Sequence, residues 1–519
     1  MGLTAGALVA SACSSSTSPS ASPGTSAGST GSTAAKGGKA GGSTGTTIAR
    51  PAGPSADVST KLTGGNGIFM GESAAADTMV PGTTKYGQAK MPAGYVQEEF
   101  LATGKATDYK AQGEMTGDGK WTFAPDTQAD YRTRVVVRRP EDPSKASGTA
   151  VVEWLNVSGG IDANPDWASF SDELVRRGDT WVGVSAQKIG IEGGPVLVAV
   201  PGFEDLVGKG IKNMDPERYG SLSHPGDGYS FDMYTQVARA VREGGPLLGG
   251  IKPDAVLAAG ESQSAIALTT YYNGVQPLTN AFDGFFVHSR AFAGLPLVAP
   301  GQAADLVGAM TQSKPTTFRT DLPAPVLDLQ AESDVIGVLN SYAVRQPDSD
   351  TFRLWEAAGT AHADLHLLGP VANNLDCGAP VNAGPMYLVA NTGIGALDTW
   401  VRDGQAPPTA PRLEVTTGAG DPAIARNQDG IAQGGIRTPP VDVPVKVLSG
   451  KSGESQALIC ILLGSTKPMD PARIAALYPS RSVYEQQYAD ATDKAIKAGF
   501  LLEADREAIK KFSDPSLVG

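Results

Sequence analysis

Cysteine, histidine and positive charge are all scarce in this chain, and each scarcity narrows what the protein can do. The 519 residues include 3 cysteines and 4 histidines. They form no cluster with metal-ligand spacing, so a structural zinc site is not expected. The 42 basic residues against 54 acidic ones give a net charge of −12. An acidic surface of this kind disfavours a nucleic-acid partner.

Long apolar runs are also missing after the N-terminal segment. No later stretch reaches the roughly 18 apolar residues of a transmembrane helix. At the N-terminus, residues 2–12 read GLTAGALVASA and are followed at once by Cys13. This pattern resembles the end of a bacterial lipoprotein signal, although no Lys or Arg precedes it; a tail with a chance cysteine is the alternative. We expect export, with a lipid on Cys13 anchoring the protein to the outer face of the cytoplasmic membrane.

The segment after this cysteine has the composition of a linker. Ser, Gly, Thr, Ala and Pro dominate residues 14–60, which predicts a flexible tether. Residues 61–519 are then expected to form one catalytic domain. Cys377 and Cys460, the remaining two cysteines, are a candidate disulfide in an exported protein, and two buried thiols are the alternative.

Short apolar runs alternate with segments of helical spacing through much of the chain. The predicted strands are 95–100, 109–114, 131–138, 149–155, 180–185, 255–259, 283–287, 326–330 and 352–357. The predicted helices are 167–177, 231–244 and 265–272. This alternation predicts an α/β fold whose central sheet is mostly parallel and covered by helices on both faces. Two segments interrupt the pattern, an insertion at 187–229 and a candidate cap at 290–322.

The strongest local signal is the segment Gly260-Glu-Ser-Gln-Ser264, which lies between a predicted strand and a predicted helix. In the nucleophile elbow of α/β hydrolases, a serine occupies the sharp turn between a strand and a helix. Small flanking residues allow that turn, and Ser264 takes the place of the usual last glycine. The pattern predicts an α/β-hydrolase fold with Ser262 as the nucleophile.

A serine nucleophile needs a general base, and the four histidines leave few choices. In this fold the chain order is serine, acid, histidine. His224 is excluded because it precedes Ser262 in the chain. His288 is excluded because it follows Ser262 by only 26 residues (288 − 262), which leaves no room for an acid-bearing strand between them. His362 lies in a Gly-containing loop after the last predicted strand and is favoured as the base. His366, four residues further on, is expected one turn into a helix.

The acid should follow a strand that lies between the serine and the histidine. The strand 326–330 leads into an exit loop that carries both Glu332 and Asp334. Asp334 is the favoured acid and Glu332 is the alternative. Either carboxylate would orient the imidazole and stabilise its cation.

The oxyanion of the reaction should be stabilised by two backbone amides. One amide belongs to Gln263, and we place the other at Val157, in the loop after the strand 149–155. A plain strand-to-helix turn is the alternative interpretation of that loop. The polar residues considered as pocket lining are Asn156, Glu261, Arg218, Tyr219, His224 and Asp227. The last four of these lie in the insertion, and a structural role in holding the insertion together is an equal alternative for them.

Several segments together resemble bacterial proteins described as alpha/beta hydrolase domain-containing. These segments are 152–160 (VEWLNVSGG), 218–227 (RYGSLSHPGD), 260–264 (GESQS), 355–362 (WEAAGTAH) and 463–468 (LGSTKP). The resemblance runs from about residue 60 to the C-terminus. It implies a hydrolase fold with a triad of Ser262, Asp334 and His362, and it implies no particular substrate.

The leading hypothesis is therefore a hydrolase that cleaves a small-molecule carboxylic ester through an acyl-enzyme on Ser262. This chemistry requires no cofactor. An acyltransferase that uses the same triad is an alternative within the enzymes. A catalytically silent, tethered binding protein is an alternative of a different class.

Overall fold

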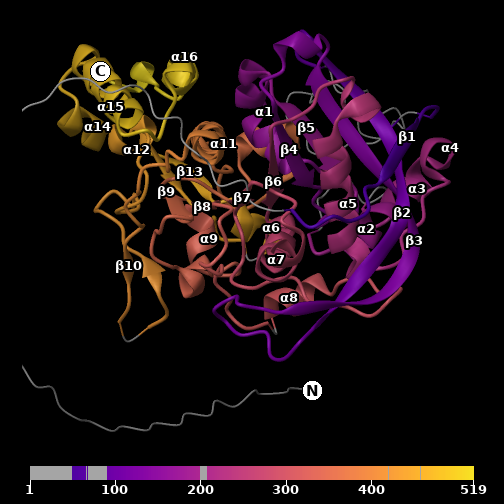
Figure 1. Ribbon diagram of the computed structural model, residues 1–519. Coiled ribbons are helices and arrows are strands. Elements are labelled where there is room, and N and C mark those ends of the chain that lie inside the picture. Colours follow the sequence, from indigo (N-terminus) through magenta and orange to yellow (C-terminus); the bar gives the residue numbers. More distant parts are fainter. Residues whose placement is uncertain are drawn as a thin grey trace, which may run out of the picture. The chain divides into compact units, whose positions relative to one another are not determined.

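A single large sheet organises the part of the chain that the computed structural model describes (Figure 1). The described residues are 50–65, 67, 91–198, 207–311, 313–418, 420–455 and 457–519. Within them the sheet has nine strands in the order β1-β2-β3-β5-β4-β6-β7-β8-β9. Cys13 and residues 14–49 of the predicted tether lie outside the described residues.

One side of the sheet is a long antiparallel hairpin. β2 (Tyr95–Ala111) and β3 (Phe123–Pro140) pair along nearly their whole length. The sequence predicted three short runs here instead of two long strands. The reason is visible in β3, where all of residues 124–130 are exposed or half-buried, so that the first part of the strand shows no apolar alternation.

The edge strand β1 (Asp57–Lys61) corrects the predicted boundary of the tether. It pairs with β2 in antiparallel fashion, although residues 14–60 were expected to be a flexible linker. Four of its five residues are exposed and Val58 is half-buried. Backbone hydrogen bonds to β2, and not apolar burial, hold this strand, so its composition resembled that of the linker before it.

The other strands of the sheet run parallel to one another, as expected. They are β4 (Thr149–Trp154), β5 (Thr180–Val184), β6 (Ala255–Glu261), β7 (Gly284–His288), β8 (Val326–Ala331) and β9 (Phe352–Ala357). All their residues are buried except Arg353, which is half-buried. Strands covered on both faces read as nearly continuous apolar runs, which is why the sequence located them. The predicted α/β-hydrolase fold with a mostly parallel sheet is confirmed.

Helices cover both faces of this sheet, and successive strand residues alternate between two cores. Val152 of β4 belongs to a core shared with α5 (Ser230–Glu243) and α6 (Gln263–Thr270). Its neighbour Val151 belongs to a core shared with α1 (Pro165–Arg177) and α11 (Met386–Asp403). The period-2 alternation of strand side chains therefore builds one hydrophobic layer on each face.

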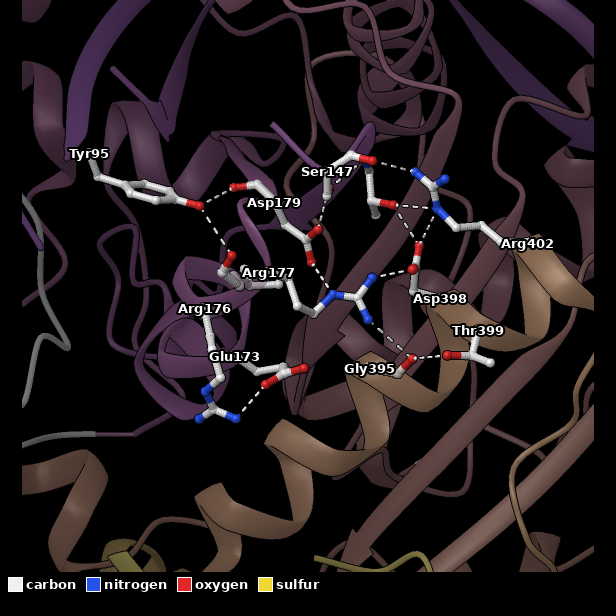
Figure 2. Close-up of polar contacts among 12 residues, drawn as sticks. Tyr95, Ser147, Glu173, Arg176, Arg177, Asp179, Gly395, Asp398, Thr399 and Arg402 are labelled. Carbon is white, nitrogen blue, oxygen red and sulfur yellow. Dashed lines mark hydrogen bonds and ion pairs between the residues drawn. The ribbon is translucent and has the colours of Figure 1, made fainter. Parts of the chain in front are cut away.

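A polar network ties α1 to α11 at the amino ends of β4 and β5 (Figure 2). Arg177 of α1 pairs with Asp179, at 3.0 Å, and with Asp398 of α11. Asp398 also accepts a 2.6 Å hydrogen bond from the hydroxyl of Thr149, the first residue of β4. Ser262 lies beyond the carboxyl end of β6, at the opposite edge of the parallel strands, so this network supports the scaffold and not the site.

The remaining elements form the insertion, the cap segment and the C-terminal region. The insertion carries α2 (Lys188–Glu192), α3 (Gly210–Met214) and α4 (Pro216–Tyr219), α7 (Gln276–Thr279) follows α6, and the cap segment carries α8 (Leu306–Thr311). After β8 and β9 come α9 (Glu332–Val335) and α10 (Leu365–Leu368). The C-terminal region holds β10 (Val415–Thr416), β11 (Ala423–Ile424), α12 (Pro439–Asp442), β12 (Lys446–Ser449), α13 (Leu458–Leu462), β13 (Ser465–Pro468), α14 (Pro471–Leu477), α15 (Arg481–Lys497) and α16 (Arg506–Lys510). In the part of the chain described, no helix combines the length and hydropathy that a membrane span requires.

Candidate active site

Ser262 occupies a strained turn between β6 and α6. Its φ of 59° and ψ of −117° are unusual for a residue with a side chain, and such backbone strain costs about 1–3 kcal/mol. The backbone N–H of Ser262 donates to the carbonyl of His288 at 2.9 Å, which helps to hold the turn. A Cβ at Gly260 would come within 3.1 Å of the backbone of Ser264, so a glycine relieves crowding at the position where the sequence motif has one.

His362 joins Ser262 and Asp334 in one chain of hydrogen bonds. Its Nε2 lies 2.8 Å from Ser262 Oγ, and its Nδ1 lies 2.9 Å from Asp334 Oδ1. The second carboxylate oxygen of Asp334 accepts the N–H of Ala331 at 2.7 Å, which orients the acid. The three side chains follow β6, β8 and β9, so the carboxyl ends of parallel strands bring them together.

Glu332, the alternative acid, makes no hydrogen bond to His362 in the described structure. Its carboxylate accepts the N–H of Gly359 at 2.7 Å and pairs with Arg426. The next residue, Ser333, accepts the backbone N–H of His362 at 2.7 Å. This part of α9 therefore braces the loop that carries the histidine, while Asp334 contacts the imidazole.

Two carboxylates set the electrostatics of the imidazole. Burial opposes the charged form of His362, but Glu261 and Asp334 outweigh it and raise the pKa of His362 to about 9. Glu261 Oε1 lies 3.4 Å from His362 Nε2. Burial raises the pKa of Glu261 to about 7, although the histidines His362 and His288 act in the opposite direction. The site thus holds a histidine that favours its protonated form.

Ser262 and His362 line a small cavity of about 20 Å³. The other lining residues are mostly apolar and come from separate segments: Ser158, Leu197, Val198, Gln263, Ile266, Met310, Val338, Leu339, Leu458 and Leu462. The insertion, the cap segment and α13 each contribute to this lining. Sequence reasoning missed the aliphatic residues because, taken singly, they read as ordinary core positions.

The loop after β4, where the sequence predicted an oxyanion donor, makes hydrogen bonds to the residues on either side of Ser262. The N–H of Val157 donates to Gln263 Oε1 at 3.3 Å, and Gln263 Nε2 donates to Gln187 Oε1 at 2.6 Å. The side chain of Asn156 donates to the carbonyl of Glu261 at 3.0 Å. The backbone N–H of Val157, the candidate oxyanion donor, therefore contacts the side chain of Gln263, the residue after Ser262, through a long hydrogen bond.

The four polar residues predicted in the insertion hold it to the rest of the domain and do not line the cavity at Ser262. Arg218 and Tyr219 both bind Glu99 of β2, at 3.1 and 2.7 Å. His224 bonds backbone groups through both ring nitrogens. Asp227 accepts two backbone N–H groups at 2.7 Å, one of them from the cap segment. Of the two interpretations left open by the sequence, the structural one fits these contacts.

The other two histidines of the carboxyl edge have partners away from the serine hydroxyl. His366 Nε2 bonds the carbonyl of Ala168 at 3.0 Å, and its ring stacks on Tyr387 with centroids 4.0 Å apart. His288 Nδ1 lies 3.0 Å from a carboxylate oxygen of Asp166. No group of three or more His, Cys, Asp or Glu residues with the arrangement of a metal site occurs among the described residues.

A disulfide joins Cys377 to Cys460, with their Cα atoms 5.3 Å apart. Both cysteines are buried. Cys460 belongs to α13, whose residues Leu458 and Leu462 line the cavity at Ser262. The cross-link therefore anchors one wall of the candidate active site.

The mostly parallel sheet and its strand order are those of the α/β-hydrolase fold class. The chain belongs to the family described as "Alpha/beta hydrolase domain", which matches residues 58–511. Among curated proteins, none matches this chain.

Solved structures that match part of this chain include several esterases and hydrolases. One is a fungal esterase from Rhizomucor miehei, with 12% identity, a TM-score of 0.29, and coverage of 58% of this chain and 85% of that one. Another is a serine hydrolase without a lid from Xanthomonas campestris, with 15% identity, a TM-score of 0.26, and coverage of 50% and 86%. A third is an acetyl xylan esterase from Thermoanaerobacterium, with 15% identity, a TM-score of 0.20, and coverage of 40% and 52%.

Proposed function

We propose that the protein hydrolyses a carboxylic ester through an acyl-enzyme on Ser262. The observation that carries the proposal is the continuous hydrogen-bonded chain from Ser262 Oγ through His362 to Asp334, at 2.8 and 2.9 Å. In the first half of the reaction, His362 takes the hydroxyl proton as Ser262 attacks the ester carbonyl. Asp334 keeps the imidazole oriented and stabilises its cation.

The oxyanion of the tetrahedral intermediate would face the backbone amides of Gln263 and Val157. The Val157 N–H first exchanges its 3.3 Å hydrogen bond to the Gln263 side chain for the oxyanion. His362 then passes its proton to the departing alcohol. Water enters, the same histidine acts as its general base, and the acid product leaves Ser262 free.

The mostly apolar walls of the cavity favour a substrate that is uncharged and largely apolar. Apart from His362, the lining residues carry no ionisable side chain. A charged group placed against such walls would lose its hydration without gaining a partner, which costs several kcal/mol. We therefore propose that the group entering this cavity is a short, uncharged acyl or alkoxy chain.

A pair of serine variants from the same motif tests the activity. Wild type is expected to hydrolyse p-nitrophenyl esters of short acids, and Ser262→Ala is expected to lose about 10⁴-fold or more of kcat. Ser264→Ala is the matched control, because the hydroxyl of Ser264 is buried and has no hydrogen-bond partner in the structure. It should keep its turnover and its labelling by a fluorophosphonate probe, which Ser262→Ala should lose.

Turnover retained by Ser262→Ala would refute the assignment. A new ester formed when an acceptor alcohol is added would instead indicate an acyltransferase. A folded wild type that neither turns over esters nor reacts with the fluorophosphonate would indicate a binding protein.

We also propose that the protein is exported and anchored through a lipid on Cys13. The signal-like run before Cys13 supports this location. The disulfide between Cys377 and Cys460 supports it independently, because disulfides persist mainly in oxidising compartments outside the cytoplasm.

A further inference from the structure

The carboxyl group of Glu261 faces the catalytic histidine but has no role in the mechanism given above. β6 ends at Glu261 and places its Oε1 3.4 Å from His362 Nε2, the same nitrogen that bonds Ser262 Oγ at 2.8 Å. Glu261 is 4% exposed, so water competes little for its carboxylate. Its main chain is held by the hydrogen bond from Asn156. The Nε2 nitrogen of the imidazole therefore has two oxygen neighbours.

Several other titratable groups act on Glu261, His362 or their neighbour His288. They are Asp334 of α9, His288 of β7, Asp166 of α1 and, acting on His288, Asp364 of the histidine loop. Burial lowers the pKa of His288, and burial raises the pKa of Asp166 well above its usual range, so each of these favours its neutral form. The charges that act on the imidazole are thus mainly those of Glu261 and Asp334.

We propose that Glu261 is a positioning residue that holds the proton on His362 Nε2 between its arrival from Ser262 and its departure to the leaving alcohol. This inference rests on the proposed function. When Ser262 Oγ bonds to the acyl carbon, its proton moves to Nε2, and Oγ becomes a poor acceptor for it. Glu261 Oε1 then accepts the Nε2–H hydrogen bond until the leaving oxygen takes the proton and the ester C–O bond breaks.

The same contact has a consequence in the free enzyme. A carboxylate beside Nε2 favours the imidazolium, and the imidazolium cannot act as a base toward Ser262. The pKa of about 9 for His362 and of about 7 for Glu261 place an ion pair between these two residues at intermediate pH. Because kcat/KM reports the pKa of the free enzyme, activity should rise with pH up to the pKa of His362.

The test is a pH titration of His362 in the folded protein. The chain has 4 histidines, so spectra of protein labelled with ¹³C at the imidazole carbons contain few signals, and His362→Gln identifies the relevant one. Glu261→Gln removes a negative charge 3.4 Å from His362 Nε2. This should lower the midpoint of the His362 titration by about 1–3 pH units. Glu261→Asp keeps the charge but withdraws it by one methylene, so its midpoint should lie between those of Glu261→Gln and wild type.

Glu332→Gln is the matched control, since Glu332 is an equally buried carboxyl group that does not contact the imidazole. Its midpoint should equal that of wild type. The acid limb of kcat/KM should move with the midpoint in each variant. An unchanged midpoint in both Glu261 variants would overturn the inference, whether or not they turn over esters. Because the titration needs no substrate, its outcome is separate from that of the Ser262→Ala experiment.

Discussion

The roles of two neighbouring carboxylates, Asp334 and Glu332, can be distinguished by replacing each with its isosteric amide. In Asp334→Asn, the Nδ1–H of His362 loses a charged acceptor at 2.9 Å, and the amide can present a donor that favours the wrong tautomer. The same change in a Ser-His-Asp triad lowers kcat about 10⁴-fold. At 1.36 kcal/mol per factor of ten, this corresponds to about 5.5 kcal/mol of transition-state stabilisation. Since an Asn oxygen can still accept the N–H of Ala331, we expect the variant to fold.

Glu332→Gln should instead lower the stability of the fold and leave most of the activity. Its carboxylate accepts the backbone N–H groups of Gly359 and Gly450, at 2.7 and 2.9 Å, and pairs with Arg426. The amide of a glutamine can accept hydrogen bonds from only some of these donors. Each buried donor left without a partner costs about 1–3 kcal/mol. Because the side chain of Arg426 is 23% exposed, water can partly replace the lost ion pair. We expect a lower melting temperature and a loss of kcat/KM far smaller than that of Asp334→Asn.

The assay is the hydrolysis of one p-nitrophenyl ester at one pH, with thermal unfolding followed by circular dichroism on the same preparations. Asp334→Asn should melt close to wild type and be nearly inactive. If Asp334→Asn were active while a folded Glu332→Gln had lost about 10⁴-fold, the acid would be Glu332 and the reasoning from geometry would be wrong.

Two further predictions concern the cysteines. The disulfide closes a loop with a sequence separation of 83, for which the chain-entropy relation gives about 4.5 kcal/mol, so the Cys377→Ser, Cys460→Ser double variant should unfold at a lower urea concentration. Its ester turnover should also fall because α13, which supplies Leu458 to the cavity, loses its cross-link; an unchanged urea midpoint would contradict the first expectation. Cys13→Ala should move the exported protein from the membrane fraction to the soluble extracytoplasmic fraction, and a variant that stays with the membrane would show that Cys13 is not the anchor.

Local pattern was sufficient for the parallel strands and for the sharp turn at Ser262, the proposed nucleophile. The predicted strand 352–357 has the same bounds as β9, in which five of the six residues are buried. The small residues around Ser262 are required by the turn itself, so the motif carries its own conformation. The choice of His362 followed from the scarcity of histidine and from chain order. By contrast, β1 and the outer half of β3 depend on hydrogen bonds to a neighbouring strand and show no apolar alternation.

The surroundings of the reactive groups were decided only by tertiary structure. Asp334 and Glu332 lie in one turn of chain, and sequence spacing lets either reach the histidine. Contacts from distant residues separate them, because Arg426 and the N–H of Gly450 bind Glu332 while Asp334 faces the imidazole. Glu261 adjoins the nucleophile in the sequence, yet its position 3.4 Å from His362 depends on a loop 100 residues away. The sequence determined which groups this protein has for chemistry, and packing between distant segments determined which of them meet.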